Sequence, residues 1–96
     1  MVTATRALTP TARADDYLSY LEAEWAALPA IAVAWDSWDE AERLDFQMEW
    51  PIREDRLATL RVLAADGELT PGQRERLAKL DECVARNRPL LDRLFF

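Results

Sequence analysis

The pattern of apolar residues predicts two long helices folded back on each other between Leu57 and Leu94. The second helix carries six residues spaced alternately three and four apart, the heptad spacing that places side chains on one seam. These residues are Leu77, Leu80, Val84, Asn87, Leu91 and Leu94. The first helix offers a matching stripe of Leu57, Leu60 and Ala64, flanked by Leu63. We therefore expect an antiparallel helical hairpin in the C-terminal half.

The segment between these helices contains a helix stop followed directly by a helix start. Gly67 suits the left-handed backbone conformation that ends many helices. Thr70 can cap the next helix, with Pro71 at its first position and Gln73 completing a capping box. The hairpin turn is therefore predicted at residues 66–73.

Pro89 interrupts the second helix of the hairpin. In a continuous helix it would remove a hydrogen bond to Ala85 and cost about 3 kcal/mol, so we expect a kink or a break. Asn87 has two interpretations: a polar seam residue that fixes register or oligomeric state, or the cap of a short final helix. The cap is the favoured interpretation.

The N-terminal half predicts a helix that opens at Thr9 or Thr11 and ends near Pro29. Its inner face consists of Ala14, Leu18, Leu21, Trp25 and Leu28. Residues 30–35 are apolar at every position, which favours a short buried helix. Residues 1–8 show no periodicity and are expected to form a flexible arm.

The next helix is expected to run from a capping box at Ser37 to about Trp50, with two apolar faces. One face gathers Trp38, Ala41, Leu44 and Met48, and the other gathers Phe46 and Trp50. Glu42, Asp45 and Glu49 fill a boundary between them. Such a helix is either central in a bundle or paired on one side with a partner.

These elements predict an all-α protein: a small single-domain bundle of four or five helices built on the C-terminal antiparallel hairpin, spanning residues 9–96. Half of the 96 residues are hydrophobic and only two are glycine, which argues against disorder. No uncharged stretch reaches the roughly 20 residues of a spanning helix, so we expect no membrane insertion.

The charge is distributed unevenly along the chain. Residues 1–50 hold ten acidic and three basic side chains, a balance of −7; residues 51–96 hold eight and nine, a balance of +1, which together give the net charge of −6. Nucleic-acid-binding domains usually have the opposite sign, and anionic lipid would repel this surface. Direct binding to nucleic acid or membrane is therefore not expected.

Several kinds of catalytic or metal site lack their usual residues. The chain contains no histidine, which removes the commonest general base and the commonest nitrogen ligand for metals. Cys83 is the single cysteine and is expected to be a small core residue in a reducing, cytoplasmic setting. No phosphate-binding glycine loop is present. We expect no cofactor, no metal and no catalytic residues, with the clustered carboxylates as the one remaining enzymatic or metal-binding alternative.

The four tryptophans all lie in the acidic half, and tryptophan is enriched at interface hot spots. Phe46 and Trp50 are either buried centrally or exposed at an interface, and the second interpretation predicts a partner-binding site. Its residues would be Trp38, Glu42, Asp45, Phe46, Glu49 and Trp50.

The leading hypothesis is a non-enzymatic protein–protein interaction module that forms a homodimer or docks, as an adaptor or inhibitor, on a basic partner. The first alternative is a nucleic-acid mimic whose carboxylates, from Asp15 to Glu49, occlude a DNA- or RNA-binding site. The second alternative is a carboxylate metal-binding protein or enzyme.

Overall fold

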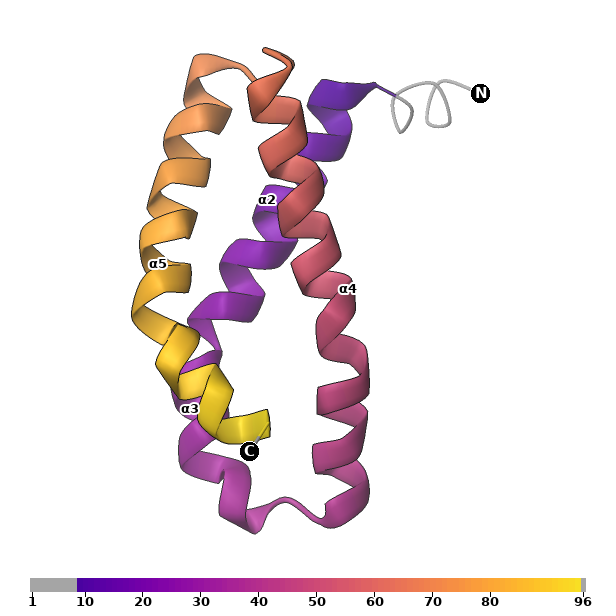
Figure 1. Ribbon diagram of the computed structural model, residues 1–96, viewed down its shortest axis with the longest axis vertical. Coiled ribbons are helices and arrows are strands. Elements are labelled where there is room, and N and C mark those ends of the chain that lie inside the picture. The colour runs from indigo at the N-terminus through magenta and orange to yellow at the C-terminus, as the bar shows by residue number, and fades with distance from the viewer. Residues whose placement is uncertain (1–8, 96) are drawn as a thin grey trace.

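Helices make up nearly all of the chain in the computed structural model, which describes residues 9–95. A long helix α2 (Pro10–Ala26) is followed by a short helix α3 (Leu28–Ala34) and a 3-10 turn η1 (Trp35–Ser37). Two further long helices, α4 (Glu40–Ala65) and α5 (Pro71–Phe95), complete the fold (Figure 1). No strand occurs among the described residues, which confirms the all-α prediction. The predicted arm at residues 1–8 lies outside them.

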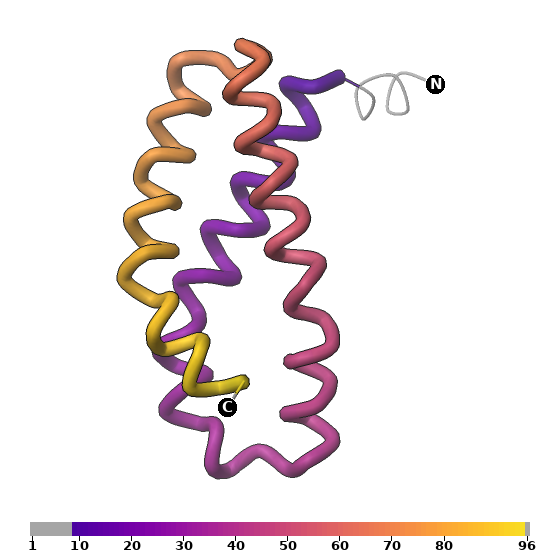
Figure 2. Tube along the Cα trace, in the orientation of Figure 1, coloured from indigo at the N-terminus to yellow at the C-terminus, as the bar shows by residue number. Residues whose placement is uncertain are grey.

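The three long helices are arranged around α2 rather than around a C-terminal hairpin. Helix α4 runs antiparallel to α2 and α5, and α2 crosses obliquely behind both of them (Figure 2). Helix α2 packs extensively on α4 and on α5, whereas α4 and α5 touch each other much less. The two long C-terminal helices were therefore predicted, but the prediction that they pack directly against each other as a hairpin was not confirmed.

The predicted inner faces of α2 and α5 form the core. All five inner-face residues of the N-terminal helix, from Ala14 to Leu28, have no exposed surface. Five of the six seam residues of α5 are buried, and Asn87 is partly exposed. Leu57 and Leu60 of α4 are also buried. The heptad spacing thus identified the buried side of α5, although α2 rather than α4 provides most of its cover.

Helix α3 contradicts the expectation that the apolar segment at residues 30–35 is buried. The segment is helical, but Leu28 is its only buried residue and Val33 is 89% exposed. The helix packs on one side, mainly against α5 at the end of the bundle. The predicted short helix is therefore present, but its outer side is exposed to solvent.

The turn between α4 and α5 follows its sequence signals closely. Gly67 has a φ of +73°, its N–H donates to Ala64, and the N–H of Glu68 donates to Leu63. These two bonds are the pair that ends a helix in a Schellman motif. The capping box is also confirmed: the hydroxyl of Thr70 accepts from the N–H of Gln73 at 3.1 Å, and the side chain of Gln73 accepts from the N–H of Thr70 at 3.0 Å.

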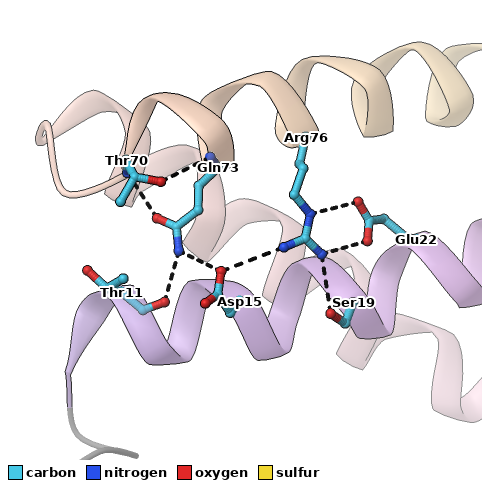
Figure 3. Close-up of polar contacts among 7 residues, drawn as sticks. All are labelled: Thr11, Asp15, Ser19, Glu22, Thr70, Gln73 and Arg76. Atoms are coloured by element: carbon cyan, nitrogen blue, oxygen red, sulfur yellow. Dashed lines mark hydrogen bonds and ion pairs between the residues drawn. The ribbon is translucent and has the colours of Figure 1, made fainter.

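Gln73 also ties α5 to α2. Its side-chain amide nitrogen donates to the carbonyl of Thr11 at 3.0 Å and to Asp15 at 2.8 Å (Figure 3). One turn later, Arg76 donates to Glu22 at 2.7 Å and lies 3.6 Å from Asp15. The hydrogen bond to Glu22 raises the pKa of Arg76. These contacts fix the beginnings of the parallel helices α2 and α5 beside each other.

Neither internal proline ends its helix. Helix α4 continues through Pro51 and α5 continues through Pro89, so the short final helix predicted after Asn87 is wrong. The last turns of α5 bend away from the line of its first turns (Figure 1), as expected of an internal proline. Asn87 is not a cap, because its side chain donates back to the carbonyl of Cys83 at 2.9 Å within the helix.

The described part of the chain forms a flat body with principal extents of 43 × 31 × 17 Å. Within that part, no helix combines the length and the apolar character needed to cross a membrane. Because the body is thin, the side of α4 that faces away from α2 is not covered by another element of the described chain.

Candidate functional site

The candidate site lies where α4 begins, and its first element is the cap of that helix. Asp39 caps α4, because its side chain accepts from the N–H of Glu42 at 2.8 Å. The capping box predicted at Ser37 is wrong: Ser37 belongs to the 3-10 turn and donates to the carbonyl of Ala34. Trp38 between them has an extended backbone, which separates the turn from the helix. Helix α4 therefore begins later than expected, at Glu40.

The 3-10 turn is fastened to α4 by Arg43. Its Nε donates to the carbonyl of Trp35 at 3.0 Å, and its guanidinium carbon lies 5.7 Å from the centre of the Trp35 ring. Arg43 thus combines a hydrogen bond with a cation–π contact. The turn and the first turns of α4 are held as one unit.

A continuous aromatic cluster lies beneath the site. Phe46 is its centre and has four aromatic neighbours, with ring centres 5.4–6.3 Å away. These neighbours are Trp35, Trp38, Trp50 and Phe95. Trp50 also meets Trp25 edge to face at 5.1 Å. The tryptophans of the acidic half therefore form one packed cluster that extends from the core to the surface.

Five side chains at this end line an open pocket of about 300 Å³. Trp38 comes from the segment before α4, and the other four come from one side of the helix, at the spacing that brings residues together on a helical face. The four are Glu42, Asp45, Phe46 and Glu49. The pocket therefore has aromatic walls and three carboxylates.

These five residues belong to the predicted partner-binding site, whereas the sixth, Trp50, does not line the pocket. Trp50 is 3% exposed and its indole N–H donates to Glu54 at 2.9 Å. Phe46 is 9% exposed and contributes to the pocket from the core. Of the two alternatives for Phe46 and Trp50, the single chain shows central burial, because this side of α4 packs into the aromatic cluster.

The pocket carboxylates have no cation of their own within residues 9–95. No ion pair joins the side chains of Glu42, Asp45 or Glu49 to an arginine or lysine there. Nor does an arginine of the described chain lie over Trp38 or Phe46. Glu42 lies in the first turn of α4, where negative charge favours the helix dipole, but Asp45 and Glu49 lie beyond that turn.

Elsewhere in the fold, the same combination of ring and carboxylate holds an arginine. Arg53 lies 5.2 Å from the ring centre of Trp50 and donates through Nε to Glu24 at 2.9 Å. Arg88 lies 5.0 Å from the ring centre of Trp25 and donates to Glu54 at 3.2 Å. In both cases a cation is placed between an aromatic face and a carboxylate.

The environment of Glu54 shows what such a placement does to a carboxylate. Burial alone would raise the pKa of Glu54, but hydrogen bonds from Arg88 and Trp50, with the charges of Arg88 and Arg61, outweigh it. The pKa of Glu54 therefore lies below its ordinary value. The charged form is the one that the fold stabilises.

Across residues 9–95, no group of three or more cysteine, aspartate or glutamate side chains is arranged to hold a metal ion. Comparison of the chain with protein-family models, curated proteins and solved structures finds no match.

Proposed function

We propose that the chain is a non-enzymatic protein–protein interaction module whose pocket receives an arginine or lysine side chain of a basic partner protein. The observation that carries the proposal is a contrast within the described chain. Two ring-and-carboxylate arrangements hold the chain's own arginines, whereas the pocket has rings and carboxylates but no such cation. A guanidinium or ammonium group of the partner would give the pocket the cation that the other two arrangements already have.

The charge around the pocket supports a cationic ligand. Residues 36–50 hold six acidic side chains and one basic side chain, a balance of −5. Charge of one sign on such a surface speeds the approach of an oppositely charged partner. Arginine fits best among cationic side chains, because its planar guanidinium stacks on rings and binds carboxylates with two hydrogen bonds.

A single side chain in this pocket would bind weakly. An exposed cation–π contact contributes about 0.5–1 kcal/mol, and an exposed ion pair contributes about 0.2–1 kcal/mol. Their sum, about 0.7–2 kcal/mol, corresponds to a dissociation constant of tens of millimolar or weaker. A protein partner would obtain the rest of its affinity from the surface around the pocket.

The acids nearer the N-terminus support docking over nucleic-acid mimicry. A mimic would use a continuous row of free carboxylates from Asp15 to Glu49. However, Asp15 and Glu22 are paired with Arg76, and Glu24 is paired with Arg53. The remaining free acids are concentrated at the pocket end, where aromatic side chains accompany them.

The experiment is an NMR titration that follows the indole N–H signals of the four tryptophans. The probes are a capped Gly-Arg-Gly peptide and the same peptide with neutral citrulline in place of arginine. We expect the Trp38 signal, assigned with Trp38→Phe, to shift with the arginine peptide and not with the citrulline peptide. Equal shifts with both peptides, or no shift at Trp38, would contradict the proposal.

A pair of charge-matched variants separates the pocket from the general effect of net charge. The pocket variant carries Glu42→Gln, Asp45→Asn and Glu49→Gln. The control carries the same number of neutralised acids on or before α5, namely Glu68→Gln, Glu75→Gln and Glu82→Gln. We expect the pocket variant to lose the Trp38 shift and the control to keep it. Equal losses would mean that overall charge, rather than the pocket, attracts the peptide.

A further inference from the structure

The outward side of α4 carries a heptad pattern that the fold leaves uncovered. Eight positions, spaced alternately three and four apart from Ala41 to Ala65, are all exposed, and seven of them are apolar. We call them the outer stripe: Ala41, Leu44, Met48, Pro51, Asp55, Ala58, Val62 and Ala65. Heptad spacing is typical of a helix that packs along another helix. Here the other helix is missing from the described chain.

The stripe includes some of the most exposed large apolar side chains of the molecule. Leu44 is 52% exposed, Met48 is 69% exposed and Val62 is 57% exposed. Ile52, half exposed, lies beside the stripe near its middle. The stripe spans 25 residues of helix, and its two ends are about 36 Å apart at about 1.5 Å per residue. Exposed apolar surface of this length on one helix is a mark of an interaction site.

We propose that the outer stripe is where a second copy of this chain binds, with the two α4 helices antiparallel. In that orientation the two copies can be aligned so that the stripe positions face each other about a two-fold axis beside Arg53. Large residues then meet smaller ones: Leu44 faces Val62 of the second copy, and Met48 faces Ala58. At the outer ends Ala41 faces Ala65, and such small residues let two helices approach closely. This proposal does not depend on the pocket, whose five residues are not part of the stripe.

The charges of α4 favour the antiparallel orientation. The part of α4 before Pro51 has four acidic side chains and Arg43, a balance of −3, and the part from Pro51 onward has three arginines and two acids, a balance of +1. Parallel helices in register would place the acidic part of one copy beside the same acidic part of the other, whereas antiparallel helices keep the two acidic parts apart. The three arginines add no attraction across the stripe, because Arg53 and Arg56 contact α2 and Arg61 pairs with Asp81 of α5.

Asp55 supports the same choice of orientation. It is the one charged residue of the outer stripe. In a parallel pair in register, the two Asp55 carboxylates would face each other across the seam. In the antiparallel pair, each Asp55 faces Pro51 of the second copy. A polar residue in a seam lowers stability but helps to select one register.

The first experiment is sedimentation equilibrium of the full chain from about 1 to 500 μM. A strip of this size is at the small end of stable interfaces, about 1,200 Å² in total, so we expect a dimer in the micromolar range. Met48→Arg should weaken it about thirtyfold or more, as the loss of a central contact does. Val33→Arg, at an even more exposed site outside the stripe, should leave it unchanged. A monomer throughout, or equal effects of both variants, would overturn the proposal.

Asp55→Ala provides a test with the opposite sign. Removing the one charge from the stripe should strengthen the dimer by about tenfold, whereas a surface without a partner would show no change. Circular dichroism checks that each variant remains helical. An unchanged or weaker dimer in this variant would place the interface elsewhere.

Cross-linking with a short bismaleimide then determines the orientation, in a Cys83→Ser background. Leu44→Cys alone should not cross-link to itself, because the two copies of residue 44 would be about 27 Å apart along the helices. A mixture of Leu44→Cys and Val62→Cys chains should give the mixed dimer, and Ile52→Cys alone should link near the axis. Efficient linking of Leu44→Cys to itself would indicate parallel helices and overturn the proposal.

Discussion

The two ends of the molecule use their carboxylates in opposite ways. Where α2 and α5 begin, Asp15 and Glu22 are paired with Arg76, and Gln73 joins the same contacts (Figure 3). Where α4 begins, the pocket carboxylates have no basic side chain paired with them in the described chain. One end thus uses its carboxylates to hold two helices together, and the other end leaves its carboxylates without a basic partner in residues 9–95.

This difference indicates which charges the fold needs. Paired carboxylates hold one helix to another, so removing either member leaves its partner unsatisfied. Unpaired carboxylates on one face of a helix repel one another, and this repulsion offsets any favourable effect that they have on the helix dipole. The fold therefore does not need the pocket carboxylates for its own packing.

The largest expected effect on stability distinguishes Trp50, which is buried beneath the pocket, from Trp38, which lines it. Trp50→Ala should destabilise the protein by about 3–5 kcal/mol, because it removes a large buried side chain from the cluster. Trp38→Ala, at the partly exposed wall, should cost much less. Denaturant unfolding measures both variants. Similar losses of stability in the two variants would mean that Trp38 is as much a part of the core as Trp50.

The next effect concerns the arginine between Trp50 and Glu24. Arg53→Met should cost about 1–3 kcal/mol, because the partly buried carboxylate of Glu24 loses its partner. Adding Glu24→Gln should recover part of the loss, because no charge is then left unpaired. A double-mutant cycle by thermal unfolding measures the coupling. Additive losses in the double variant would show that the pair does not act as a unit.

The pH dependence of stability tests the carboxylate of Glu54. Its pKa in the folded state lies below the ordinary value of 4.5, so the folded state binds fewer protons than the unfolded state. The contribution is therefore present above pH 4.5 and is lost as the pH falls through the lower, folded-state pKa. Glu54→Gln should be less stable than the wild type at pH 7, and the difference should shrink below pH 4.5. A constant difference would contradict the shifted pKa.

The smallest expected effect is on the stability of the pocket variant. Neutralising Glu42, Asp45 and Glu49 together should change the free energy of unfolding by no more than about 0.5 kcal/mol, as at surface sites without partners. The relief of mutual repulsion should offset the weaker helix dipole effect. A clear loss of stability in thermal unfolding would mean that these acids are used by the fold after all.

Local signals of the sequence were more reliable than inferences about distant contacts, although the caps predicted at Ser37 and Asn87 were wrong. The inner faces of α2 and α5, the positive φ of Gly67 and the capping box of Thr70 and Gln73 were predicted correctly. Each depends on residues within one or two helical turns, where spacing and backbone preference decide the structure.

Contacts between distant segments were not predictable in the same way. Arg53 and Glu24 are 29 residues apart, and Gln73 and Thr11 are 62 residues apart, so no spacing rule relates them. Helix spacing also brought Glu42, Asp45 and Glu49 to one face, but it did not determine which apolar side of α4 would turn inward. Both sides were apolar enough to be buried, and the aromatic side is the one that packs into the core.

The bonds of Gln73 have a consequence for how the protein opens. One buried side chain satisfies the first turn of α5 and a carbonyl of α2 at the same time. Neither helix start can fray without exposing the other to solvent. In hydrogen–deuterium exchange, the amides of these two helix starts should therefore exchange together as a single opening unit. Helix ends normally fray independently of one another, whereas these two helix starts should open together.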